Sequence, residues 1–250
     1  MPEGVWVSVH VAAQFCCVLA NSNARDMTAP YKSEVDRFIA HFKGETESVR
    51  TVVSPFHRKV LYATALDALA RAAYGSGGNK DRLTRLVREL SGWEDSERVS
   101  LPQLQLKLRS AKLSKGKLYR QVSSSLKLWG GGVRVGLQHS PDVGELSTIA
   151  DAAEMKFIES ARYSELFYIY RNNLVHEFRE PGYGWDVSGT AKRPFYMSYL
   201  GGKPQWELTF PAGFFGDLVA DSIDGLRIYL LAKKIDPYKH FNFGSMWRGK

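Results

Sequence analysis

Residues 55–75 read PFHRKVLYATALDALARAAYG, and this stretch decides the class of fold. Its apolar residues recur at intervals of four, three and four, which is the period of an amphipathic α-helix. Pro55 suits the first turn of a helix and Gly75 suits the end of one, so the stretch predicts a helix bounded by these two residues. The apolar stripe consists of Tyr62, Leu66, Leu69 and Ala73.

The same period recurs along the chain on both sides of this helix. It predicts helices over 33–42, 83–90, 147–179 (as two helices or one kinked helix) and 211–235. Residues 194–210 instead predict a β-hairpin, because an aromatic-rich run leads to a glycine pair and is followed by Trp206, Leu208 and Phe210 in alternation with polar residues. Within 98–141 the pattern is ambiguous. Leu104, Leu106 and Leu108 alternate like a strand, whereas Leu118, Val122 and Leu126 step in fours like a helix.

These patterns predict a mainly α fold, a helical bundle with one β-hairpin inserted before the last long helix. We expect a single helical domain over 27–240 that carries the hairpin 194–210. Residues 1–26 are expected to form an N-terminal extension, either loose or added as a strand, because valines at 5, 7, 9 and 11 alternate with other residues like a strand. Residues 241–250 are expected to form a C-terminal tail.

The composition is that of a globular protein. The 250 residues are 44% hydrophobic and 24% charged, and no run of 18 apolar residues exists that would span a membrane. Glu3 is the only early charge, which argues against a signal peptide. The two cysteines, Cys16 and Cys17, are adjacent and cannot form a disulfide framework, so a cytoplasmic location is expected.

The net charge of +8 is concentrated in one segment. Residues 98–141 contain nine basic residues and no Asp or Glu, so the rest of the chain has a net charge of −1. Such a segment indicates a surface for a polyanion such as RNA, although a solvated helix face is the alternative. The candidate RNA-binding residues are Lys107, Arg109, Lys112, Lys115, Lys117, Arg120 and Lys127.

Several familiar catalytic motifs are absent from the sequence. The segment GSGGNK at 75–80 lacks the Ser or Thr and the glycine spacing of a phosphate-binding loop. The six histidines show no paired ligand spacing, so no metal site and no cofactor are predicted. No Gly-x-Ser-x-Gly nucleophile elbow is present.

The segment YRNNLVH at 170–176 brings together groups suited to phosphate chemistry. Asn172 and His176 are four residues apart and share a helix face that points away from the apolar stripe, and the long side chain of Arg171 can reach the same face. An imidazole moves protons near neutral pH, and a guanidinium binds phosphate oxygens in a fork. This set predicts metal-free cleavage of RNA, in which a 2′-hydroxyl attacks its own phosphate.

Arg171, Asn172 and His176 in a helical domain resemble the signature of the HEPN superfamily, in which four to six residues separate an Arg from a His and a polar residue commonly follows the Arg. The resemblance implies a helical bundle that dimerises so that two motifs form one composite site. It also implies a metal-independent ribonuclease of a toxin–antitoxin or phage-defence type, or a relative that has lost catalysis. An antitoxin or regulatory protein is then an expected partner.

Two other Arg and His pairs, Arg50 with His57 and Arg134 with His139, have comparable spacing but lie outside continuous helical patterns. The alternative interpretation of the third pair is structural, with His176 at the negative end of the helix dipole and Arg171 paired with Glu165 or Glu180. The function hypothesis is an endoribonuclease in which His176 transfers a proton and Arg171 binds the scissile phosphate. Asn172 positions either His176 or the phosphate. Its rival is a non-catalytic module that binds nucleic acid or protein through residues 98–141.

Overall fold

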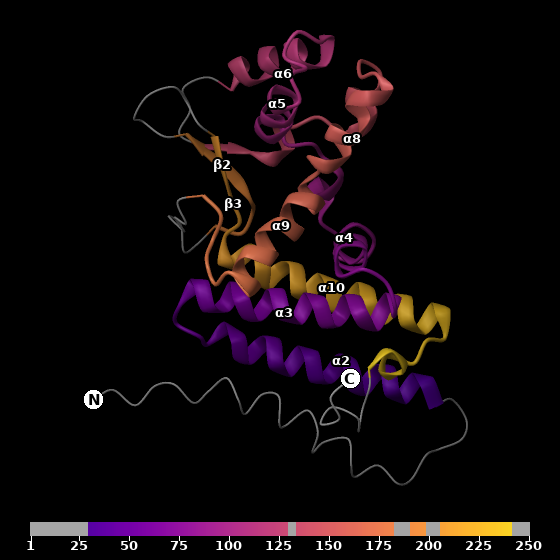
Figure 1. Cartoon of the computed structure of the whole chain (residues 1–250). Coiled ribbons are helices and arrows are strands. Elements are labelled where there is room, and N and C mark those ends of the chain that lie inside the picture. Colours follow the sequence, from indigo (N-terminus) through magenta and orange to yellow (C-terminus); the bar gives the residue numbers. More distant parts are fainter. Residues whose placement is uncertain (1–29, 130–133, 183–190, 199–205, 242–250) are drawn as a thin grey trace.

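The computed structural model describes residues 30–129, 134–182, 191–198 and 206–241. The predicted extension 1–26, the hairpin turn 199–205 and residues 242–250 of the predicted tail lie outside these ranges. The described part is mainly helical, as the sequence predicted, and contains a small antiparallel sheet (Figure 1). Its α-helices are α2 (Pro30–Arg50), α3 (Pro55–Tyr74), α4 (Asn79–Glu89), α5 (Leu101–Ser110), α6 (Lys117–Leu128), α7 (Val143–Ser147), α8 (Ala152–Ser160), α9 (Tyr163–His176) and α10 (Ala212–Lys233).

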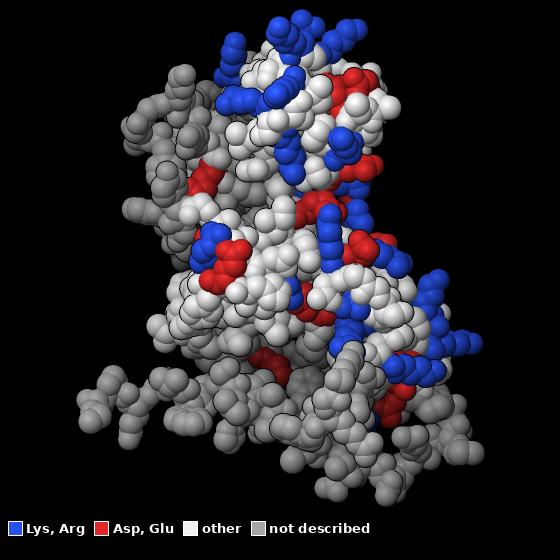
Figure 2. All heavy atoms as spheres, in the orientation of Figure 1, with Lys and Arg blue, Asp and Glu red and all other residues white. Residues whose placement is uncertain are grey.

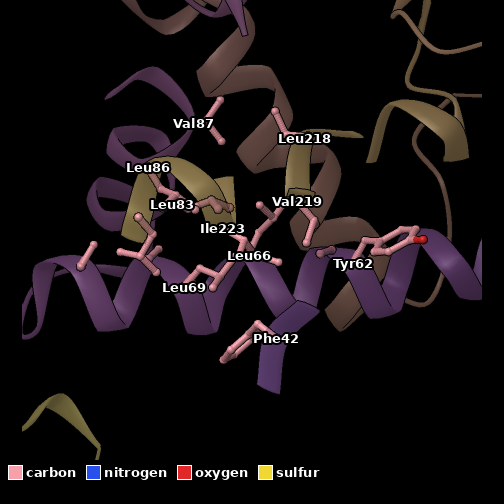
Figure 3. Close-up of a cluster of buried hydrophobic side chains, with 14 of the residues drawn as sticks. Phe42, Tyr62, Leu66, Leu69, Leu83, Leu86, Val87, Leu218, Val219 and Ile223 are labelled. Carbon is pink, nitrogen blue, oxygen red and sulfur yellow. The ribbon is translucent and has the colours of Figure 1, made fainter. Parts of the chain in front are cut away.

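The helix that the opening stretch predicted is α3. The Ser54 side chain accepts a hydrogen bond from the His57 N–H, Pro55 occupies the first turn, and the helix ends at Gly75 with a φ of 67°. Its apolar stripe packs against α2, α4 and α10 in the larger hydrophobic core. Figure 3 shows Leu66 and Leu69 of α3 among side chains of the neighbouring helices.

Within the ambiguous basic segment, residues 101–110 and 117–128 form the helices α5 and α6. Leu104 and Leu108 are fully buried whereas Leu106 is 49% exposed, which fits a helix with one buried face and excludes the alternating strand. These helices pack with α7 and α8 around a second hydrophobic cluster, at the end of the molecule opposite α2 (Figure 1).

The hairpin over 194–210 is confirmed by the antiparallel pairing of β2 (Phe195–Ser198) with β3 (Trp206–Thr209). The expectation of one hairpin was incomplete, because β1 (Arg134–Gly136) also pairs with β2 and makes a three-stranded sheet. Three residues are too few for their pattern to reveal a strand.

Helix α9 connects the two ends of the molecule (Figure 1). Its first residue, Tyr163, donates a backbone hydrogen bond to the Arg98 carbonyl next to α5, and its later turns pack against α3. The ring of Trp93 lies between the two ends, where it contacts Phe167 of α9 and Phe214 of α10. Three short 3-10 helices complete the described structure: Glu94–Glu97, Leu137–His139 and Pro237–His240.

Candidate functional site

The last two turns of α9 hold the residues that the sequence singled out. Phe167, Tyr170 and Leu174 are buried in the larger core, so the helix cannot rotate about its axis. This packing leaves His176, the last residue of α9, exposed and Asn172 half-buried. The motif therefore lies on a rigid element at the molecular surface.

One arm of the Arg171 guanidinium joins the three motif residues. Its Nη1 donates to Asn172 Oδ1 at 2.8 Å and lies 3.0 Å from Nε2 of His176. A guanidinium only donates hydrogen bonds, so Nε2 of His176 is the acceptor in this contact. The contact orients the imidazole of His176 toward Arg171.

The second arm of the guanidinium forms an ion pair with a residue that the sequence reasoning missed. Nη2 of Arg171 contacts a carboxylate oxygen of Asp67 on α3. The Arg171 residue is only 5% exposed, and burial lowers the pKa of its guanidinium below the ordinary value. Its Nε is buried without a hydrogen-bond partner among the described residues. The sequence suggested a guanidinium facing solvent or a partner, whereas the structure buries it against α3.

The two glutamates that the sequence offered as partners of Arg171, Glu165 and Glu180, instead form salt bridges with lysines. Glu165 pairs with Lys80 at 2.7 Å, and Glu180 pairs with the fully buried Lys59 at 3.0 Å. Tyr170 also donates its hydroxyl hydrogen to Glu180. A signal for Asp67 was present in the sequence, because it is the only charged residue between Val60 and Ala70.

The seven candidate RNA-binding residues lie on α5, on α6 and in the loop between them. Six of their side chains are exposed and that of Lys107 is half-buried. None of the seven forms a salt bridge within the described ranges, although Arg109 donates to the Tyr119 hydroxyl at 3.4 Å. Figure 2 shows Lys and Arg gathered over the top of the molecule, where Figure 1 places α5 and α6. We call this surface the α5–α6 basic face.

The basic face and the motif lie at opposite ends of α9. The helix begins beside the start of α5 and ends at His176. A 14-residue helix is about 20 Å long, at 1.5 Å per residue. A ligand that touches both must therefore bridge at least the length of α9 within one copy of the chain.

The described ranges have two further properties. No group of three or more His, Cys, Asp or Glu residues among them is arranged to hold a metal ion. No helix within these ranges combines the length and apolar character needed to cross a membrane. Comparisons with protein-family models, with curated proteins and with solved structures find no match to this chain.

Proposed function

We propose that the chain is a metal-independent, HEPN-like endoribonuclease that cleaves RNA at a site built on Arg171, Asn172 and His176. The observation that carries the proposal is the Nη1 group of Arg171, which contacts both Asn172 and the exposed His176. A phosphate-binding group and a proton-transfer group thus share one hydrogen bond at the surface end of a rigid helix.

That shared hydrogen bond supports a specific order of events. In the resting arrangement the lone pair of Nε2 is occupied by the N–H of Arg171. A phosphate oxygen that draws this N–H away frees Nε2 to accept the proton of the RNA 2′-hydroxyl. The 2′ oxygen then bonds to phosphorus, the bond from phosphorus to the 5′ oxygen breaks, and a 2′,3′-cyclic phosphate forms.

The leaving 5′ oxygen needs a proton, for which the imidazolium of His176 in a second copy is the proposed donor. We therefore propose a homodimer with a composite cleft, as the family resemblance implies. Phe178, two residues after His176, is 64% exposed and has a φ of 51°. An exposed aromatic ring beside the motif suits an interface. Phe178→Asn tolerates this backbone and is expected to weaken dimer formation and cleavage together.

The decisive experiment is incubation of the purified protein with a mixed RNA pool in EDTA. We expect cleavage that leaves 2′,3′-cyclic phosphate ends, and we expect His176→Ala to abolish it without loss of folding. The matched control is His139→Ala, which removes another exposed histidine that follows an Arg by five residues. Unchanged cleavage in His176→Ala would falsify the proposed mechanism.

A second candidate function is a non-catalytic module that binds RNA through the α5–α6 basic face. Two observations favour it. Arg171 is buried against Asp67, which withdraws its guanidinium from solvent. Six of the seven basic side chains of this face are exposed, and none of the seven forms a salt bridge within the described ranges. Binding that weakens steeply with salt, in the absence of any cleavage by the wild type, supports this function instead.

A further inference from the structure

A small cavity lies between the end of α2, the start of α3 and the start of α10, away from the motif. Its volume is about 230 Å³, and three cationic side chains line it: Arg50, Arg58 and Lys192. Arg58 and Asp67 are nine residues apart on α3, which places them half a turn apart around the helix axis. The cavity is therefore separate from the site around Arg171.

Arg58 is the central feature of this cavity. Its side chain is partly buried and forms no salt bridge or side-chain hydrogen bond with the described residues, and its Nε is buried without a partner. Removal of a guanidinium N–H from water without a hydrogen-bond partner is costly, and such an unsatisfied group calls for an explanation. A bound anion is an explanation that the surrounding groups support.

The other cations lie at the exposed rim of the cavity. Arg50 pairs with Glu47 at 3.0 Å, and Lys192 is 3.8 Å from Asp217, the only acidic residue that lines the cavity among those described. Both side chains are more than half exposed, so they are free to reorient toward a ligand. Three cations against one lining carboxylate leave the cavity with a net positive charge.

Neutral groups in the cavity also suit an anion. The first turn of α10 has no side-chain cap, and the positive end of this 22-residue helix borders the cavity at Gly213. Tyr62 contributes a hydroxyl. Burial raises the pKa of Tyr62, while Arg50 and Arg58 act in the opposite direction, so both charges are felt at this hydroxyl.

The close approach of two segments creates the cavity. A Cβ at Gly213 would lie 2.8 Å from the Ala191 carbonyl oxygen, so glycine allows residues 191–192 to lie against α10 and brings Lys192 to the rim. At Gly216 a Cβ would lie 3.4 Å from the Tyr62 hydroxyl, which is ordinary contact. The floor is therefore formed by backbone and small side chains, which leaves room for a tetrahedral anion.

We propose that this cavity binds a phosphate group, either as inorganic phosphate or as the phosphomonoester of a small nucleotide. Arg58 supplies the guanidinium fork, the rim cations close over the group, and Tyr62 and the first turn of α10 donate to its oxygens. The occupant thus supplies the counter-charge that Arg58 lacks.

The test is isothermal titration and thermal unfolding of the full chain with inorganic phosphate and, separately, with AMP. Chloride at matched ionic strength is the control for salt. We expect phosphate to raise the melting temperature and chloride not to do so. Tighter binding of AMP assigns the site to a nucleotide, and equal binding assigns it to the phosphate group alone. No binding of either compound overturns the proposal.

Two variants locate the binding. Arg58→Gln is expected to weaken phosphate binding at least about tenfold and to leave the ligand-free protein as stable as the wild type, because it removes an uncompensated charge. Gly216→Asp introduces a carboxylate beside Tyr62 and is expected to abolish the phosphate-induced rise in melting temperature. The matched control, Arg85→Gln, removes a surface guanidinium that pairs with Glu89. Equal phosphate binding in Arg58→Gln and Arg85→Gln overturns the assignment.

Discussion

The guanidinium of Arg171 on α9 and the carboxylate of Asp67 on α3 form an ion pair that ties the motif helix to the larger core. The other arm of the same guanidinium contacts Nε2 of His176 at 3.0 Å. The orientation of an exposed imidazole therefore depends on a carboxylate more than 100 residues earlier in the sequence. Asp67 is a positioning residue for His176 in this arrangement.

Removal of the Asp67 carboxylate is expected to destabilise the protein. Asp67→Ala leaves the buried guanidinium of Arg171 without its counter-charge, and the expected loss in the free energy of unfolding is about 3 kcal/mol. This value is at the lower end for buried pairs because the Asp67 side chain is 24% exposed. Urea unfolding followed by circular dichroism measures the change.

The double variant Asp67→Leu/Arg171→Met tests whether the charge is the cause. It removes both charges and fills the space with apolar groups, so we expect most of the lost stability to return. A double variant that is as unstable as Asp67→Ala would show that packing, and not an unpaired charge, accounts for the loss.

Salt dependence separates the α5–α6 basic face from the general charge of the protein. Replacement of Lys112, Lys117 and Arg120 by Gln is expected to reduce the slope of log K against log salt by about 2, at roughly 0.7 per lost phosphate contact with single-stranded RNA. Fluorescence anisotropy with a labelled RNA at several salt concentrations measures this slope.

The charge-matched control replaces Lys43, Arg85 and Arg227 by Gln. These three cations pair with carboxylates on α2, α4 and α10, outside the basic face. We expect their removal to leave the slope within about 0.5 of the wild-type value. Equal reductions in the two triple variants would mean that RNA responds to net charge and not to this surface.

The sequence predicted those helices whose boundaries and apolar stripe have local causes. The start and end of α3 follow from Ser54, Pro55 and Gly75, which act on neighbouring residues. The secondary structure of residues 101–110 was ambiguous in the sequence, because leucines at 104, 106 and 108 also fit a strand. Only tertiary packing determines that Leu106 faces solvent. The local sequence pattern was thus sufficient to predict the long helices. It was not sufficient for residues 101–110, whose secondary structure is distinguished by tertiary packing.

The candidate site was predictable only in part for the same reason. Helical spacing is sufficient to bring Arg171, Asn172 and His176 to one end of α9. The burial of Arg171 depends on how α9 packs on α3, and no local pattern specifies that Asp67 faces it. An isolated charge in an apolar helix indicates a buried partner without saying which one.

Alkaline pH is expected to destabilise the protein through two buried tyrosines. Tyr163 and Tyr196 are fully buried, they bond to Ser140 and Ser100 respectively, and burial raises the pKa of both hydroxyls above the ordinary value of 10. Above about pH 10 the unfolded state loses these protons while the folded state keeps them, so the free energy of unfolding falls as pH rises. Each tyrosine contributes at most about 1.4 kcal/mol per pH unit.

Urea unfolding of the wild type and of Tyr163→Phe between pH 9 and 11 measures this contribution. The variant lacks one of the two ionisable hydroxyls, so its stability is expected to fall less steeply with pH than that of the wild type. Its stability at pH 8 is expected to be lower because the Ser140 hydroxyl loses a buried partner. Parallel pH profiles for the two proteins would exclude Tyr163 as a source of the alkaline loss.

Two glycines inside helices are expected to respond in opposite directions to the same substitution. Gly44 lies within α2, where an added Cβ meets nothing within 4 Å, so Gly44→Ala should stabilise the protein by roughly 0.5–1 kcal/mol through helix propensity. At Gly225 in α10 an added Cβ would lie 2.0 Å from the Leu90 carbonyl oxygen.

Gly225→Ala is therefore expected to destabilise the protein by about 2 kcal/mol, because α10 must move away from the end of α4 and propensity cannot offset that displacement. Both variants change one hydrogen to a methyl group in a helix, so each serves as the control for the other. Thermal unfolding of the two variants and of the wild type measures both changes in stability. If Gly225→Ala were as stable as Gly44→Ala, α10 and α4 would not approach each other as closely as the structure indicates.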